Sequence, residues 1–170
     1  MTTAGKSAMN NSLMSNLIFQ LQGIQSGKIW LGVNYEKKLV GLSEADFFEK
    51  PDELHSVAEI LSHLTAWRKD TIVKITTGKG SLRDQDPSNW SSNKELRKLG
   101  SKNILNNYQS TLPSIIDLLK DKPDEFLEEL YFDIDYKGYY PYSFALFGML
   151  QHDIYHLGQI AMLIRLMGKK

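Results

Sequence analysis

The sequence predicts an all-α protein built as a four-helix bundle. Four long segments carry apolar residues at the three- and four-residue steps of a helix, and strand patterns are nearly absent. The 170 residues suit one domain that is long enough to bury a hydrophobic core. A chain of four amphipathic helices buries its apolar stripes by antiparallel packing around a shared interior, with room for a short extra helix or hairpin in the connections.

The first helix is predicted over residues 11–24, where leucine, isoleucine and methionine recur with a helical period. Residues 29–42 are less clearly periodic and predict a second, short helix. Ser43 follows directly, and a serine before acidic residues is a typical helix cap. We therefore expect one more helical turn between Ser43 and Pro51.

The middle of the chain predicts two long helices joined by a long loop. The first covers residues 55–78 and ends at a glycine, as many helices do. Residues 78–93 are polar and rich in glycine, serine and aspartate, and loops of this length are often functional or mobile. The next helix is predicted over residues 94–120, with a kink or break near Ser110 because Pro113 lies inside it.

The last part of the chain predicts a small hairpin followed by the fourth helix. Aromatic residues flank Lys137 and Gly138, which suit the turn of a hairpin. The final helix is predicted over residues 142–167. Its apolar stripe recurs at three- and four-residue steps and consists of Ala145, Met149, His152, His156, Ile160, Leu163 and Met167.

Composition restricts the classes of function. Twenty basic and twenty acidic residues cancel, which argues against a nucleic-acid partner. The lack of cysteine excludes disulfides, thiolate metal sites and a cysteine nucleophile. No membrane-spanning run and no signal peptide are recognisable, so we expect a cytoplasmic protein without a membrane partner. We expect a disordered tail over residues 1–9 and a single domain over residues 10–170.

Three of the four histidines predict a metal site. His152 and His156 are four residues apart on one helical face, so their imidazoles can converge on one cation. His63 lies on or beside the apolar stripe of the helix over residues 55–78, and a bundle can bring this face opposite the other two. Three neutral imidazoles leave coordination positions for water or substrate, which is typical of a catalytic metal site.

The alternative is that these histidines are ordinary core residues. A histidine on an apolar face usually finds hydrogen bonds for its ring nitrogens, and a pair spaced by four is a weak signal by itself. Three unpaired imidazoles in an apolar interior would each cost about 1–3 kcal/mol in lost hydration. A shared cation removes this cost, so the set of three favours a metal.

Five neighbouring residues are candidates for the surroundings of the site. His55 either caps its helix or lines the mouth of a pocket. Glu59 can orient a ligand, act as a general base on metal-bound water, or form an ion pair. Trp67 closes the pocket floor or belongs to the core, and Gln159 can hydrogen-bond to Tyr155, to a ligand or to another helix.

Two segments resemble the hallmark motifs of the DinB/YfiT-like metalloenzyme superfamily. These are "HSVAEILSHLTAWR" and "LFGMLQHDIYHLGQIAMLIRL". The similarity extends to residues 26–51 and covers most of the chain, and it is weakest between about residues 80 and 142. The resemblance implies a four-helix bundle, often homodimeric, that binds one divalent ion, nickel or zinc, through His63, His152 and His156. Many relatives have a tryptophan just after the motif serine, where Val57 and Ala58 stand here, so a relative's substrate is not carried over.

The resemblance also implies a function. The best understood relatives transfer low-molecular-weight thiols, so we expect a metal-dependent thiol transferase acting on a small-molecule electrophile. A metal-dependent hydrolase, with metal-bound water in place of the thiol, is the first alternative. A metal-binding stress-response protein without turnover is the second.

Overall fold

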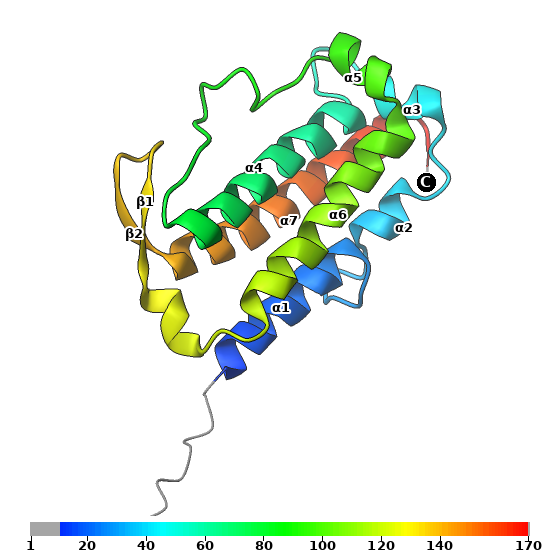
Figure 1. The fold of residues 1–170 in the computed structure, drawn as a ribbon. Helices are drawn as coiled ribbons and strands as arrows, with labels where there is room; N and C mark the ends of the chain where they lie inside the picture. The colour runs from blue at the N-terminus through cyan, green and yellow to red at the C-terminus, as the bar shows by residue number, and fades with distance from the viewer. Residues whose placement is uncertain (1–10, 170) are drawn as a thin grey trace, which may run out of the picture.

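The computed structural model describes residues 11–169, which form a bundle of four long helices (Figure 1). These are α1 (Ser12–Gln25), α4 (Val57–Thr77), α6 (Ser101–Leu119) and α7 (Tyr142–Leu166). The connections contain α2 (Tyr35–Leu39), α3 (Glu44–Phe48), α5 (Asn93–Leu99), the 3-10 helix η1 (Asp124–Glu128), and the strands β1 (Leu130–Asp133) and β2 (Gly138–Pro141). The predicted all-α bundle is confirmed, whereas the predicted tail over residues 1–9 lies outside the described residues.

The four long helices surround a common apolar core. Both α4 and α1 pack against α6 and α7, while α3 packs on α4 and α2 packs on α7. One buried cluster includes Tyr35, Leu61 and Leu157, and a second includes Met14 and Leu146 toward the other end of the bundle. Among the described residues, no helix has the length and apolar character needed to cross a membrane.

Serines start three of the helices through reciprocal hydrogen bonds. In each case the serine side chain accepts the backbone N–H three residues on, and the acidic residue there accepts the N–H of the serine. The expected turn after Ser43 is α3. At its far end, α4 stops at Gly78, whose φ of +71° is readily adopted only by glycine.

The prediction of one helix over residues 94–120 is wrong, because the chain breaks at Gly100. This glycine has φ +79° and ψ 153°, and it separates α5 from α6. Pro113, where we expected a kink or break, lies inside α6. A proline leaves the carbonyl four residues earlier, that of Gln109, without its helical donor. Nε2 of Gln25 in α1 donates to that carbonyl at 3.4 Å, so a neighbouring helix supplies the missing partner.

A two-stranded antiparallel hairpin leads into α7, as predicted. Tyr131 pairs with Tyr140, and Asp133 pairs with Gly138. The backbone of β1 also bonds to the end of α4, because the N–H of Phe132 donates to the carbonyl of Gly78 at 2.9 Å. The hairpin therefore lies beside the C-terminal end of α4 and the start of the long loop over residues 79–92 (Figure 1).

A buried ion pair joins α4 to α7 in the middle of the bundle. Arg68 and Asp153 are 1% and 0% exposed, and Nη2 of Arg68 donates to Oδ2 of Asp153 at 2.5 Å. The same nitrogen donates to the hydroxyl of Tyr108 at 2.9 Å, and Nη1 donates to Oε1 of Gln25 at 2.8 Å. The hydroxyl of Tyr35 donates to the backbone carbonyl of Asp153 at 2.7 Å. Five helices thus meet around one guanidinium–carboxylate pair.

Candidate metal centre

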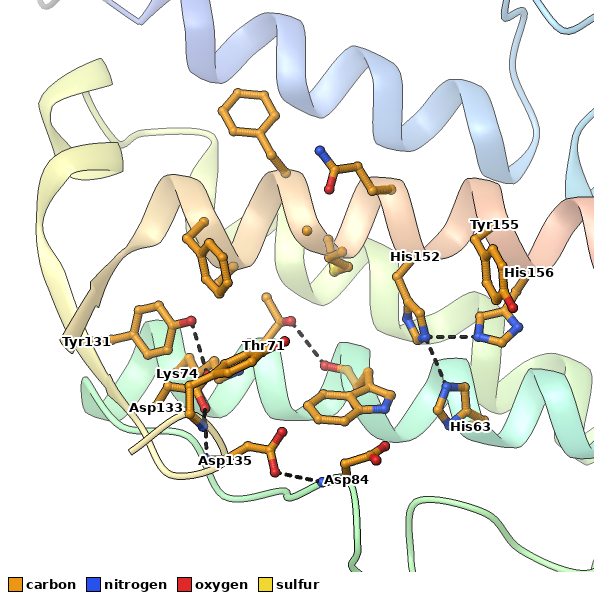
Figure 2. Close-up of a pocket in the computed structure, with 18 of the residues that line it drawn as sticks. His63, Thr71, Lys74, Asp84, Tyr131, Asp133, Asp135, His152, Tyr155 and His156 are labelled. Atoms are coloured by element: carbon orange, nitrogen blue, oxygen red, sulfur yellow. Dashed lines mark hydrogen bonds and ion pairs between the residues drawn. The ribbon is translucent and has the colours of Figure 1, made fainter. Parts of the chain in front are cut away.

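Helix α4 carries the first histidine of the site into the interior. The start of the helix is fixed by Ser56, whose hydroxyl accepts the N–H of Glu59 at 3.1 Å, while the Glu59 carboxylate accepts the N–H of Ser56 at 3.0 Å. His63 follows about two turns after Ser56 and is buried, with 5% of its surface exposed. Its Nε2 faces α7 (Figure 2).

Helix α7 supplies the other two histidines, one helical turn apart. Nε2 of His152 lies 2.9 Å from Nε2 of His63 and 2.9 Å from Nε2 of His156 (Figure 2). The three ring nitrogens all lie within 4.8 Å of one another. The structure therefore brings together the three histidines that the sequence singled out, in a cluster compatible with a metal site.

Hydrogen bonds on the outer side of two rings fix where their protons lie. Nδ1 of His156 lies 2.6 Å from Oε1 of Gln159, and Nδ1 of His63 lies 3.2 Å from the carbonyl oxygen of Asn89. Because these oxygens only accept, each Nδ1 carries the proton and each neutral ring turns an Nε2 lone pair to the centre. Two lone pairs thus face Nε2 of His152.

This arrangement fits a shared cation better than a hydrogen-bonded cluster. A neutral His152 can donate one proton from Nε2, which satisfies only one of the two approaches at 2.9 Å. In the other approach, an Nε2 lone pair would face Nε2 of His152 at 2.9 Å with no proton between the two atoms. A divalent cation held by all three Nε2 atoms removes that conflict, and neutral imidazole is a common ligand of such ions.

The environment of the rings keeps them in the form that binds metal. Burial, together with the neighbouring His156 and His63, lowers the pKa of His152 to about 3. Burial and the nearby His63 lower the pKa of His156 to about 4. Burial also lowers the pKa of His63, although its hydrogen bond to Asn89 acts in the opposite direction. The three imidazoles are therefore neutral at neutral pH, as metal coordination requires.

A cavity of about 1340 Å³ opens onto the three histidines. Side chains of α4 and α7 form its long walls, and residues of the 79–92 loop and of the β1–β2 hairpin complete it (Figure 2). At the end away from the histidines, Nζ of Lys74 lies 2.9 Å from carboxylate oxygens of both Asp70 and Asp133. The cavity exceeds the usual size of a small-molecule pocket, and a ligand in it can reach the half-buried His152.

Four of the five other candidate residues line this cavity, namely His55, Trp67, Tyr155 and Gln159. His55 does not cap α4, since Ser56 does, and its ring instead stacks on Trp90 with centroids 3.9 Å apart. Trp67 lies edge-on to His63, with centroids 6.4 Å apart. Tyr155 is 62% exposed and lies edge-on to His156, with centroids 5.0 Å apart.

Glu59 is not part of the cavity wall. Its carboxylate accepts the backbone N–H groups of Ser56 and of Asn93, at 3.0 and 3.1 Å, and pairs with Lys50 at 3.1 Å. Burial acts to raise the pKa of Glu59, but these contacts hold it below its usual range. Within the described residues, no hydrogen bond joins Glu59 to the histidine cluster. The geometry favours an anchoring role over the roles of general base or ligand partner.

Two residues next to His63 could not be found from the sequence pattern. One is Asn89, which contributes its backbone carbonyl, and the other is Trp90, whose indole stacks on His63 with centroids 3.9 Å apart and an interplanar angle of 8°. The available signals were the length of the loop and a tryptophan in an otherwise polar stretch. A backbone carbonyl leaves no trace in a pattern of side chains.

The fold and the site define a helical-bundle protein with a three-histidine centre suited to a metal ion. The chain belongs to the DinB superfamily, whose sequence model matches residues 33–160 and so includes all three histidines. No curated protein and no solved structure matches the chain. The resemblance noted from the two motifs is thus confirmed for the family and for the helical fold.

Proposed function

We propose that the protein is a metal-dependent enzyme that transfers a low-molecular-weight thiol to an electrophilic small molecule. The observation that carries this proposal is that three histidines with converging Nε2 atoms line a cavity of about 1340 Å³. Three neutral ligands leave both charges of a divalent ion uncompensated, which favours an anionic fourth ligand such as a thiolate. Nickel and zinc are the ions we expect.

Each residue of the site has a role in this proposal. His63, His152 and His156 hold the ion, and a bound ion supplies Lewis acidity that favours the thiolate form of a thiol. Gln159 fixes the proton of His156 on Nδ1, which keeps Nε2 free. Trp67, Tyr155 and the other aromatic side chains of the wall contact the carbon skeleton of the substrates and displace water from the reacting sulfur.

Metal-dependent hydrolysis is the second candidate, and the far end of the cavity favours it. Lys74 there is held between Asp70 and Asp133, and Thr71 also lines the wall. A small thiol would not need polar groups so far from the histidines, since Lys74 follows His63 by eleven residues, or about 16 Å along a helix. A longer polar substrate of a hydrolase would reach them.

The first experiment is elemental analysis of untagged protein purified without chelator, beside His152→Ala and His55→Ala. We expect about one equivalent of nickel or zinc in the wild type and in His55→Ala, and its loss in His152→Ala. The reason is that His152 belongs to the three-histidine cluster, whereas His55 does not. Substoichiometric metal in all three proteins, not restored by added metal, would leave the histidines as core residues and overturn the enzyme proposal.

The second experiment separates the candidate functions once metal is found. Cysteine, glutathione or another small thiol is added to protein that contains cobalt in place of the native metal. A spectral shift supports thiol binding at an exchangeable position, and turnover is then screened with electrophiles. A shift with hydrolysable substrates or their products, but not with thiols, favours the hydrolase. No shift with any ligand indicates a sealed site and a passive metal-binding protein.

The homodimer and the cytoplasmic location stay predictions.

A further inference from the structure

The segment from Asp84 to Asn93 lies beside the metal centre and is anchored at both ends. At its start, the N–H of Asp84 donates to Oδ1 of Asp135 in the turn of the hairpin at 3.0 Å. At its end, the N–H of Asn93 donates to Oε1 of Glu59 at 3.1 Å, and the hydroxyl of Ser56 donates to Oδ1 of Asn93 at 2.6 Å. The segment is therefore held between the hairpin and the start of α4.

Inside this segment, Asn89 is fixed by three hydrogen bonds. Its Nδ2 donates to the backbone carbonyl of Asp84 at 2.7 Å and to Oδ1 of Asp84 at 3.1 Å, and its N–H donates to the carbonyl of Asp86 at 2.9 Å. Asn89 is 1% exposed, and its own Oδ1 accepts no hydrogen bond from the described residues. A buried oxygen without a hydrogen bond lowers the stability of the fold. Stability alone therefore does not explain why an asparagine occupies position 89.

The fixed backbone of Asn89 directs its carbonyl at His63. The oxygen lies 3.2 Å from Nδ1, and this contact selects the tautomer in which Nε2 is free to bind a cation. The two other histidines are oriented differently. His156 is bonded by Gln159 of its own helix, and Nδ1 of His152 has no hydrogen bond among the described residues. Among the described residues, His63 is the one of the three whose Nδ1 is hydrogen-bonded from outside its own helix.

Trp90 controls the plane of the same ring. Its indole lies between two imidazoles, stacked on His63 at 3.9 Å and 8° and on His55 at 3.9 Å and 9°. The stack restricts tilting of the His63 ring, while the Asn89 carbonyl restricts its flip. With both tilting and flipping restricted, Nε2 of His63 points toward His152 and His156.

We propose that Asn89 and Trp90 are positioning residues that hold His63 in its metal-binding orientation, with Asp84 holding Asn89 in turn. This inference rests on the proposed metal site and adds to it the loop that orients one of the proposed ligands, His63. Partners that fix the tautomer and orientation of a metal-bound histidine typically change metal affinity by roughly ten- to a hundredfold. If Trp90 only filled space, its loss would lower the stability of the fold without weakening zinc binding by the folded protein.

The test measures the zinc dissociation constant of the full chain by competition with a chromophoric chelator. We expect Asn89→Ala and Trp90→Ala to bind zinc roughly ten- to a hundredfold more weakly than the wild type. Trp90→Phe keeps a planar ring over His63 and should recover most of the affinity. Trp30→Ala removes a tryptophan that is 98% exposed, and should bind as the wild type does. Zinc binding with equal, measurable affinity in all five proteins overturns the proposal.

A second readout does not depend on metal or on activity. Long-range ¹H–¹⁵N spectra of the metal-free protein report which nitrogen of His63 carries the proton. We expect Nδ1 in the wild type and in Trp90→Phe, and a mixture of tautomers in Asn89→Ala. If the wild type binds no zinc but shows this pattern, the proposed function fails while the positioning role holds. An unchanged tautomer in Asn89→Ala overturns the positioning role, whatever the metal content. If Asn89→Ala does not fold, Asp84→Ala loosens Asn89 and is read by the same spectra.

Discussion

Nδ1 of His156 and Oε1 of Gln159 lie 2.6 Å apart, with Gln159 almost one turn further along α7. One helix therefore carries both a histidine of the cluster and the group that fixes its proton. The spacing is local, so this orientation does not depend on how α7 packs against its neighbours.

This contact predicts the effect of changes at Gln159. Gln159→Leu removes the acceptor, and we expect zinc to bind roughly ten- to a hundredfold more weakly, because the proton is no longer held on Nδ1. Gln159→Glu keeps an acceptor and makes it stronger, so its zinc affinity should equal or exceed that of the wild type. Chelator competition measures both variants. Equal affinity in Gln159→Leu and in the wild type would mean that the contact does not orient His156.

The ion pair between Arg68 and Asp153 predicts a large cost for removing one charge. Asp153→Asn leaves the guanidinium buried without a counter-charge, and we expect a loss of about 3–5 kcal/mol in the free energy of unfolding. The double variant Arg68→Met, Asp153→Leu removes both charges and should lose much less. Urea unfolding of the metal-free proteins provides the comparison. If the double variant lost as much as Asp153→Asn, the unpaired guanidinium would not be the cause of the loss in the single variant.

Gln25 is predicted to contribute to the stability of the fold because Pro113 leaves a helical carbonyl without its donor. Gln25→Ala removes the donor to the Gln109 carbonyl and an acceptor of Arg68, so we expect a loss of about 1–3 kcal/mol in the free energy of unfolding. In a Pro113→Ala background, residue 113 again donates to Gln109, and the loss caused by Gln25→Ala should be smaller. A double-mutant cycle in urea measures this difference. The same loss in both backgrounds would show that Gln25 acts through Arg68 alone.

The lowered pKa of Glu59 predicts part of the loss of folding stability at low pH. Its pKa in the folded protein lies below the ordinary value of 4.5, so its carboxylate contributes stability above pH 4.5 that is lost as the pH falls through the folded value. Glu59→Gln can still accept the N–H of Ser56 but cannot titrate. We expect its stability to fall less steeply with acid than that of the wild type. Urea midpoints from neutral pH to about pH 3 test this, and parallel curves would rule out the contribution.

The same change tests the catalytic alternative for Glu59. Because the carboxylate lies outside the cavity, Glu59→Gln should keep its metal and its response to added thiols. A variant that folds, binds metal and has lost turnover would instead restore Glu59 as a general base.

The parts of the site that depend on local spacing could be predicted from the sequence. A separation of four residues fixes the relation of His152 to His156 on any helix, and the apolar neighbours of His63 placed that ring near the interior. The break at Gly100 and the continuity of α6 through Pro113 could not be predicted in this way. The first depends on a backbone conformation, and the second on a side chain from another helix. Asn89 and Trp90 approach His63 only through the path of a loop, which no periodicity describes.

His63 and His152 are separated by 89 positions in the chain. Neither α4 nor α7 alone holds all three nitrogens, so the set is complete only after the two helices have docked. An ion bound at the proposed site would therefore bridge α4 and α7 and stabilise their docked arrangement, because neither helix alone offers it the full set of ligands.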